Sequence, residues 1–354
     1  MRFLTGTLLF LSSSTFAIEL NVSGFGSIIG TQVTGGDGYV AHYPSMASYD
    51  DSFNMIEESR LGVQSSAVFD EKTSVTLQFT SRGSLDWGTN LEWFYLTYDV
   101  KPDLRLQAGR MRLPAYLYSD FMDVGFAYTF IRVPGDAYSV DAVNYNGLSL
   151  TYSTQLGTID TSLQLYAGGE TTDPNTLMSY IRAFEHRRDY TDLYGAVLNF
   201  TYGPATLRTT YLSSHIEETA LDPASVPGFV NPPGEFDIAF YDVALLLDLS
   251  PFNIVAEYNE YEYYTSWLGS VSYNTGKWTF HATASDFELN EAWESHSTYG
   301  MGLRYDINSN VAFKLQVDKF DDTGYNPFSL APNPICHCAD GDVTVISSGV
   351  DFVF

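Results

Sequence analysis

Polar and apolar residues alternate along most of the chain, in stretches of about ten residues that turns and loops interrupt. In one such stretch, Leu61 and Val63 fall on one side of an extended chain, while Arg60 and Gln64 fall on the other. Because successive side chains of a strand point to opposite faces, this alternation predicts strands with one apolar and one polar face. Strong helical periodicity is hard to find, so the pattern predicts an all-β protein.

The alternating stretches predict about 16 strands, joined in turn by tight turns and by long polar loops. The expected strands cover residues 19–32, 58–69, 75–79, 92–100, 104–112, 143–152, 159–167, 193–202, 205–214, 237–249, 253–264, 267–273, 278–287, 299–307, 311–320 and 344–354. This order is typical of a transmembrane antiparallel β-barrel whose two termini lie at the short-turn rim. A barrel of about 16 strands is too wide for its own side chains to fill, and it leaves an aqueous channel.

A soluble β-sandwich would show the same alternation of polar and apolar residues. Two features favour the membrane barrel: the regular order of short and long connections, and aromatic residues near strand ends, where a barrel has its interfacial girdles. These aromatic residues are Tyr95, Tyr98, Tyr202, Tyr258, Tyr273, Trp278 and Tyr305.

The first 17 residues have the features of a secretory signal peptide. Arg2 supplies a positive charge, an apolar stretch is centred on residues 8–11, and small side chains stand at Thr15 and Ala17, before the expected cleavage site. The apolar stretch is too short to span a bilayer as a helix, and no later segment approaches 18 uninterrupted apolar residues. We therefore expect one mature domain, residues 18–354, exported from the cytoplasm.

The formal net charge is −26, with 43 Asp and Glu against 17 Lys and Arg. This charge excludes a nucleic-acid surface built on general electropositivity. It favours a surface that collects cations, including the divalent ions that bridge lipopolysaccharide.

The chain ends on an aromatic strand, and this ending resembles the C-terminal assembly signal of bacterial outer-membrane barrels. Phe352 and Phe354 are then expected to be read by the barrel-assembly machinery. Residues 59–63 (SRLGV), 107–114 (QAGRMRLP) and 351–354 (DFVF) are similar to the matching segments of Gram-negative general porins. The motifs are short, and their order and spacing along the mature chain carry the resemblance.

The resemblance implies a homotrimer of 16-stranded barrels, embedded in the lipid and lipopolysaccharide of the outer membrane. It also implies a third loop that folds into the lumen as a constriction, and passive diffusion of ions and small hydrophilic solutes. Solute preference does not follow from it.

The segment from Leu113 to Val140 stands where that third loop belongs. It is rich in aromatic residues, and we expect a loop this apolar to pack against the inner wall. The alternative is an external loop that makes trimer contacts. Its carboxylates Asp120, Asp123 and Asp136 are candidates for one side of the constriction.

The candidates for the opposite side of the constriction are wall arginines: Arg60, Arg82, Arg105, Arg110 and Arg112. Carboxylates facing guanidinium groups would set up a transverse field that sorts solutes by charge. The alternative is that Arg110 or Arg112 pairs with an aspartate and holds the base of the loop. The acidic balance of the chain predicts a mild cation preference.

Two other clusters leave alternatives open. Arg182, His186, Arg187 and Arg188 form a basic group in the fourth long loop, which suits either phosphate binding or a salt bridge between subunits. Cys336 and Cys338 favour an intrachain disulfide over a metal site, because a zinc site needs about four ligands and no second Cys/His cluster supplies the rest. Free thiols or a cross-link between chains stay open, and no cofactor is expected.

Catalysis is not expected from this sequence. The chain has six histidines, mostly in or near loops, and no G-x-S-x-G nucleophile motif. A substrate-selective channel is the main alternative to a general porin, because the aromatic loop could stack against sugars. A barrel enzyme and an adhesin that uses the long loops are further alternatives.

Overall fold

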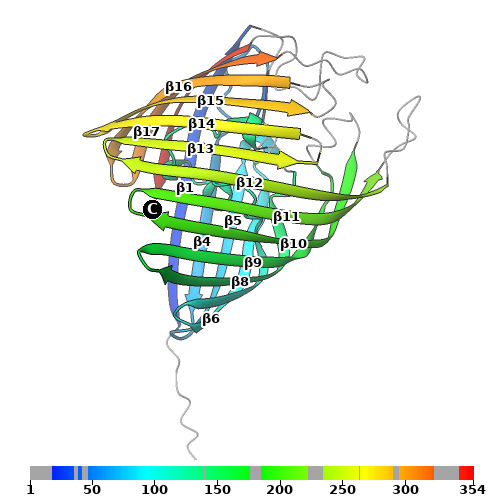
Figure 1. The fold of residues 1–354 in the computed structure, drawn as a ribbon. Coiled ribbons are helices and arrows are strands. Elements are labelled where there is room, and N and C mark those ends of the chain that lie inside the picture. Colours follow the sequence, from blue (N-terminus) through cyan, green and yellow to red (C-terminus); the bar gives the residue numbers. More distant parts are fainter. Residues whose placement is uncertain are drawn as a thin grey trace, which may run out of the picture.

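The computed structural model describes residues 18–35, 39–41, 47–138, 141–175, 185–221, 234–262, 264–289, 295–322 and 343–354. Sixteen strands form one closed antiparallel barrel, as the alternation predicts (Figure 1). The signal-peptide prediction for residues 1–17, Arg182, and the pair Cys336 and Cys338 lie outside the described residues.

Each barrel strand pairs with its neighbours in the sequence, and β1 closes the barrel by pairing with both β4 and β18. The barrel strands are β1 Glu19–Thr34, β4 Arg60–Val68, β5 Thr73–Arg82, β6 Thr89–Lys101, β7 Leu104–Arg112, β8 Asn144–Leu156, β9 Ile159–Thr172, β10 His186–Tyr202, β11 Ala205–Ala220, β12 Glu235–Leu249, β13 Phe252–Tyr261, β14 Tyr264–Thr275, β15 Trp278–Leu289, β16 Ser295–Asn308, β17 Val311–Asp322 and β18 Val343–Val353. Two short strands, β2 Tyr39–Ala41 and β3 Ala47–Tyr49, pair with each other in the loop after β1.

The largest differences from the predicted bounds are at the long-loop ends of β10 and β11. β10 begins at His186, seven residues before the predicted start, because residues 186–191 pair with β11 although they lack an apolar alternation. A bulge between Thr191 and Tyr194 joins the two parts of the strand. The basic cluster is therefore not confined to a loop: Arg187 pairs with Asp189, and Arg188 with Glu218.

The outer face of the barrel is apolar and exposed, as lipid contact requires. Leu61 and Leu148 are exposed, while the adjacent Arg60 and Ser149 on the inner face are polar and buried. Most predicted girdle residues, including Tyr98 and Tyr202, are exposed on this face. Tyr95 is an exception: it is partly buried and packs against the core inside the barrel. No helix among the described residues is long and apolar enough to cross a membrane.

The closing seam between β1 and β18 continues to the last residue of the chain. The backbone N–H of Phe354 donates to the carbonyl of Gly24 (2.9 Å), and the N–H of Gly24 donates to the carbonyl of Phe354 (2.8 Å). The last aromatic residue therefore completes the hydrogen bonding of the barrel.

The backbone conformation at position 109, in the segment that resembles a porin motif, requires a glycine. Its φ is +137°, and a Cβ added there would lie 2.2 Å from the carbonyl oxygen of Phe94. Gly157, in the turn between β8 and β9, also has a positive φ (+66°), but a Cβ there would meet no atom within 4 Å.

We predict that Gly109→Ala destabilises the barrel more than Gly157→Ala does. Both variants carry the backbone cost of about 1–2 kcal/mol for a positive φ, but only Gly109→Ala adds a steric clash, worth about 1–3 kcal/mol. The temperature at which the folded form is lost on a denaturing gel measures the difference. Equal loss of stability in the two variants would contradict the close approach of β6 and β7.

Candidate functional site

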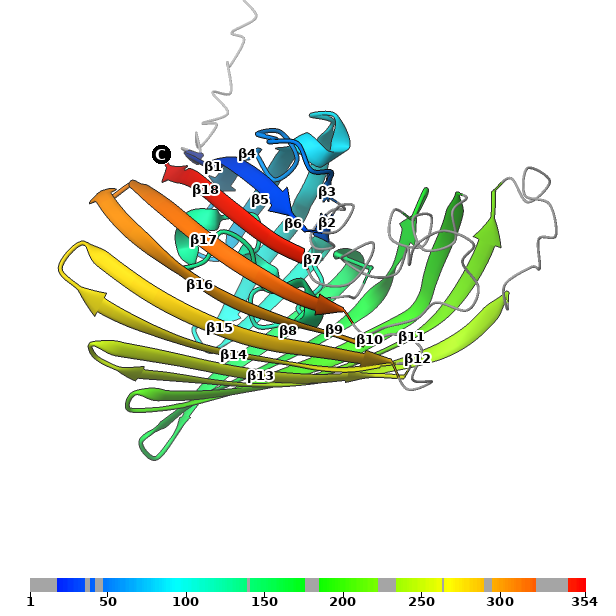
Figure 2. The same cartoon turned by 90° about the horizontal axis from the view of Figure 1, so that it is seen from above.

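Residues 113–138, which follow β7, fold back into the barrel (Figure 2). The segment contains three single-turn 3₁₀ helices, η2 Ser119–Phe121, η3 Gly125–Ala127 and η4 Gly135–Ala137. η3 contacts β1 and β18, and η4 contacts β13 to β16. The inward position predicted for the third loop is therefore confirmed, and the alternative of an external loop is wrong.

Aromatic residues give the loop a hydrophobic core of its own. Tyr116 packs between Tyr138 of the loop and Phe240 of β12, with ring centroids 4.3 and 5.2 Å apart. All three side chains are buried, and Tyr118 and Phe130 belong to the same cluster. Since large apolar rings supply much of the stabilisation of a core, these contacts stabilise the loop inside the barrel.

Asp123 anchors the first half of the loop through two arginines. Its carboxylate accepts hydrogen bonds from Arg82 (2.8 and 2.9 Å) and from Arg112 (2.6 Å). Glu92 of β6 pairs with the same two arginines, at 2.8 and 3.2 Å. All four side chains are buried, and each charge has two partners of opposite sign.

Arg60 adds to this anchor without an ion pair to the carboxylate of Asp123. Its Nε donates to the backbone carbonyl of Asp123 (2.8 Å), and Nη2 donates to the hydroxyl of Tyr128 (2.7 Å). The structure therefore brings together Arg60, Arg82, Arg112 and Asp123. It places them in direct contact, whereas a transverse field needs carboxylates on one side of the constriction and arginines on the other. The alternative, in which Arg112 holds the base of the loop, is the arrangement observed.

Arg132 anchors the second half of the loop, and the sequence analysis missed it. Its guanidinium pairs with Glu58 (2.5 Å) and with Asp318 of β17 (2.6 Å). Tyr49 also donates to Glu58 (2.8 Å). A signal was present in the sequence, because Arg132 is the single basic residue between positions 113 and 140. A lone cation in an apolar loop indicates a buried acidic partner.

Cationic wall residues hold the middle of the loop by its carbonyl groups. Lys314 donates to the carbonyls of Gly125 (2.6 Å) and Phe130 (2.7 Å), and it pairs with Asp351 (2.8 Å). Arg304 donates to the carbonyl of Phe126 (2.6 Å) and pairs with Asp306 (2.8 Å).

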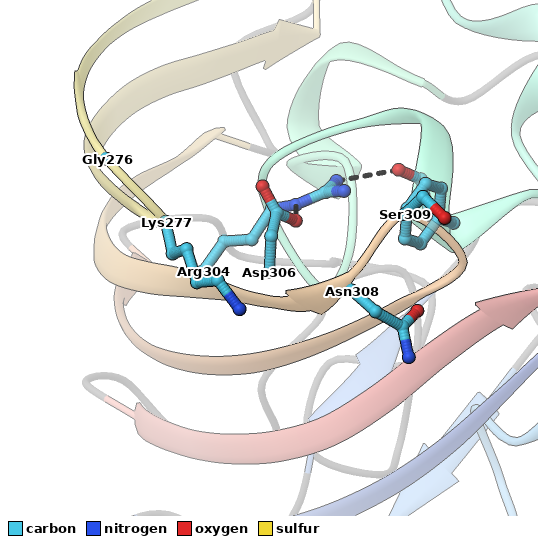
Figure 3. Close-up of a pocket in the computed structure, with 7 residues that line it drawn as sticks. Gly276, Lys277, Arg304, Asp306, Asn308 and Ser309 are labelled. Carbon is cyan, nitrogen blue, oxygen red and sulfur yellow. Dashed lines mark hydrogen bonds and ion pairs between the residues drawn. The ribbon is translucent and has the colours of Figure 1, made fainter.

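Arg304 also lines a hollow of about 470 Å³ at the short-turn rim, together with Lys277, Asp306 and Asn308 (Figure 3). Because the guanidinium of Arg304 is already paired with a carboxylate and a carbonyl, we assign no ligand to this hollow.

Asp136 and Tyr138 attach the end of the loop to the opposite wall. The Asp136 carboxylate accepts from the hydroxyl of Ser285 (2.5 Å) and lies 2.7 Å from Nδ1 of His296. The Tyr138 hydroxyl donates to Glu257 (2.8 Å). Burial raises the pKa of Tyr138 well above its usual value, so this hydroxyl keeps its proton and its donor role at any ordinary pH. Asp136 therefore lies apart from the predicted arginines, and it attaches the loop to the wall.

The remaining predicted residues lie apart from this cluster. Arg110 pairs with Glu170 of β9 (2.7 Å), and Arg105 pairs with Asp99 of β6 (2.7 Å) at a water-exposed position. Asp120 is the exposed carboxylate of the loop. Of the eight charged residues expected at the constriction, four therefore form one buried cluster, and Asp120 faces water.

The fold is shared with solved outer-membrane proteins at low sequence identity. The chain is similar to OmpF of Salmonella typhi (14% identity, TM-score 0.61, covering 97% of this chain and 99% of that one). It is also similar to the outer membrane channel DcaP of Acinetobacter baumannii (10%, TM-score 0.60, 96% and 99%) and to an anion-selective porin from Comamonas acidovorans (11%, TM-score 0.58, 95% and 100%). No family model and no curated protein sequence matches the chain. At these identities the likeness establishes the fold: a barrel like those of porins.

We predict that Asp123→Asn destabilises the folded barrel by about 3–5 kcal/mol, because it leaves a buried arginine pair with one carboxylate. Asp120→Asn removes the same charge from an exposed position of the same loop, and it should leave stability nearly unchanged. Urea unfolding of the two purified variants, followed by tryptophan fluorescence, measures the difference. If the two variants unfold at the same urea concentration, Asp123 does not anchor the loop.

Proposed function

We propose that the protein is a passive channel of the bacterial outer membrane for ions and small hydrophilic solutes. The observation that carries the proposal is a closed barrel of 16 strands, with an apolar outer face and a polar inner face, narrowed by an internal loop. A barrel of this width has room for water beside the loop. The proposal is supported by two proteins with a similar fold, one described as a porin and the other as an outer membrane channel.

A mild cation preference is part of the proposal. Among the described residues, ten buried carboxylates accompany seven buried Lys and Arg side chains. Because Arg82 and Arg112 are neutralised by Asp123 and Glu92, they contribute little positive potential to the channel. Asp120, which is exposed to water, is the charge of the loop best placed to attract cations.

The side chains inside the barrel support a channel rather than an enzyme. The arrangement most similar to a catalytic triad is Ser285, Asp136 and His296, where the serine hydroxyl donates to the carboxylate. A triad needs the serine hydroxyl bonded to the imidazole, so that the imidazole can accept its proton. Here the carboxylate occupies that position, which favours a structural role.

Export and assembly complete the proposal. Residues 1–17 would be cleaved as a signal peptide, Phe352 and Phe354 would be recognised by the barrel-assembly machinery, and three copies would associate in lipopolysaccharide-containing membrane. Trimeric OmpT of Vibrio cholerae, a similar barrel (11% identity, TM-score 0.57), is an example of such an assembly. A disulfide between Cys336 and Cys338 remains a prediction.

We predict stepwise channels in planar bilayers, with a reversal potential that indicates K⁺ preference over Cl⁻ in a KCl gradient. The preference should shrink at high salt, because the Debye length falls from about 10 Å at 0.1 M to about 3 Å at 1 M. Asp120→Asn should reduce the preference at low salt. Asp103→Asn, which removes an exposed charge from a rim hairpin, is the control and should leave it unchanged. A folded barrel that never conducts ions would contradict the proposed channel.

We predict that both deletion of Phe354 and Phe354→Ala lower the amount of folded, heat-modifiable protein in the outer membrane. The deletion removes the ring and the two backbone hydrogen bonds to Gly24, whereas Phe354→Ala keeps the backbone bonds and removes the ring. Quantitative blots of outer-membrane fractions compare the two. If Phe354→Ala assembles at the wild-type level while the deletion does not, the ring is not a recognition signal, and pairing with β1 explains the effect.

A further inference from the structure

Two acidic residues and one basic residue meet on the inner face of three adjacent strands. They are Arg208 of β11, Asp242 of β12 and Glu257 of β13, and all three side chains are buried. In the strand register, Ala244 lies directly between Arg208 and Glu257. Because alanine is small, the side chain of Asp242, two residues away on the same face, can reach both of the charged neighbours.

Two members of this cluster hold the first residues of the internal loop. Arg208 donates to the carbonyl of Pro114 (2.6 Å), and Oε1 of Glu257 accepts from the backbone N–H of Leu117 (2.9 Å). Leu117 lies three residues before Asp120, the exposed carboxylate of the loop. The position of that exposed charge therefore depends on the contacts that the cluster makes with the loop.

The carboxyl group of Asp242 lacks a donor on one of its two oxygens. Oδ1 accepts from Arg208 (3.0 Å), whereas Oδ2 is buried and has no donor among the described residues. The Asp242 side chain is also hydrogen-bonded to that of Glu257. Two ionised carboxylates cannot form such a bond, because both only accept. Both oxygens of Glu257 already accept from other donors, the N–H of Leu117 and the hydroxyl of Tyr138 (2.8 Å). A proton on Oδ2 of Asp242 would satisfy both carboxyl groups.

The neighbours of Asp242 supply neither a second cation nor a further donor to it. Asn259, directly across on β13, donates to the carbonyl of Ala137 (3.0 Å). The hydroxyl of Thr210, directly across on β11, has no hydrogen-bond partner among the described residues. Asp120, which interacts with Arg208 from the loop, is itself acidic. With both carboxyl groups of the cluster ionised, a surplus negative charge would be buried, which is costly.

A second carboxylate pair in the same barrel shows what the first cluster lacks. Arg132 also lies between two carboxylates, those of Glu58 and Asp318. Every oxygen of this second pair accepts a hydrogen bond, because Tyr49 and Gln316 add their donors to those of Arg132. Two carboxylates beside one arginine therefore need no shared proton where other donors are present. In the first cluster such a donor is missing.

We propose that Asp242 is a carboxylic acid in the folded protein, and that its proton, donated to Glu257, fixes the part of the internal loop that carries Asp120. The proton leaves the cluster with one positive and one negative charge, and each carboxyl oxygen then has a partner. Asp242 and Glu257 act as positioning residues, because they contact the loop and its anchors and not the solute. The effect on ion selectivity rests on the proposed passive channel, whereas the proton itself does not.

Infrared spectroscopy of the folded protein tests the proton directly. A carboxylic acid has a C=O stretching band that an ionised carboxylate lacks, so Asp242→Asn should remove one such band from the spectrum recorded at neutral pH. Asp103→Asn, which removes a carboxylate from a rim hairpin, is the matched control and should leave the band in place. If Asp242→Asn also leaves it in place, Asp242 is ionised and the proposal is overturned.

The second test uses the likeness between asparagine and a carboxylic acid. The amide in Asp242→Asn keeps an acceptor for Arg208 and a donor for Glu257, so this variant should unfold at the urea concentration of the wild type. Asp242→Ala removes both groups and should unfold at a lower concentration. Glu257→Gln should do the same, because its amide cannot accept from three donors. If Asp242→Asn loses as much stability as Asp242→Ala, the native side chain is a carboxylate and the proposal is wrong.

Reversal potentials in a KCl gradient test whether the cluster positions Asp120. Asp242→Asn should keep the wild-type reversal potential. Asp242→Ala and Glu257→Gln should shift it toward the value of Asp120→Asn, because the exposed charge is then no longer held in one place. Heat modifiability on a gel identifies the variants that are folded.

The outcomes separate this inference from the proposed channel beneath it. A wild-type reversal potential in folded Asp242→Ala or Glu257→Gln would overturn the positioning of Asp120, and so would a shifted one in Asp242→Asn. If the folded wild-type protein never conducts ions, the passive channel itself is wrong. The infrared band and the urea concentrations then still decide whether Asp242 carries the proton.

Discussion

The first half of the internal loop is held in place by the carboxylate of Asp123, which two buried arginines share. Removing Arg82 and Arg112 from water would cost several kcal/mol each without partners of opposite charge. Glu92 supplies one of the two negative charges from the wall, and Asp123 supplies the other from the loop. Loop and wall therefore stabilise each other through these ion pairs.

The same constraint explains the cations on the opposite wall. Buried carbonyl groups of irregular backbone need hydrogen-bond donors, because an unpaired buried carbonyl costs free energy. Lys314 and Arg304 donate to carbonyls of the loop, and Arg208 donates to the carbonyl of Pro114 (2.6 Å). These cations are used as hydrogen-bond donors to the loop. A count of the positive charges along the strands therefore overestimates the electric field that a solute would meet in the channel.

The loop is attached to most of the barrel wall. Its aromatic core includes residues of β7 to β15. Its charged contacts reach β4, β5 and β7 on one side, and β17, β18 and β1 on the other. In the proposed channel, selectivity would arise from the exposed charge of Asp120 together with the general acidity of the chain.

Much of the fold could be predicted from the alternation of polar and apolar residues. It was enough to predict about sixteen strands and which face of each strand meets lipid, because these features depend on side chains close together in the sequence. The segment that enters the barrel was predicted from the resemblance to porins and from its aromatic composition. Alternation does not tell which charges meet. Asp123 lies 41 residues from Arg82, and Arg132 lies 186 residues from Asp318. Closure of the barrel and the path of the loop bring these residues together. For that reason the loop's position could be predicted from sequence, whereas its anchors, Arg132 above all, were found only in the tertiary structure.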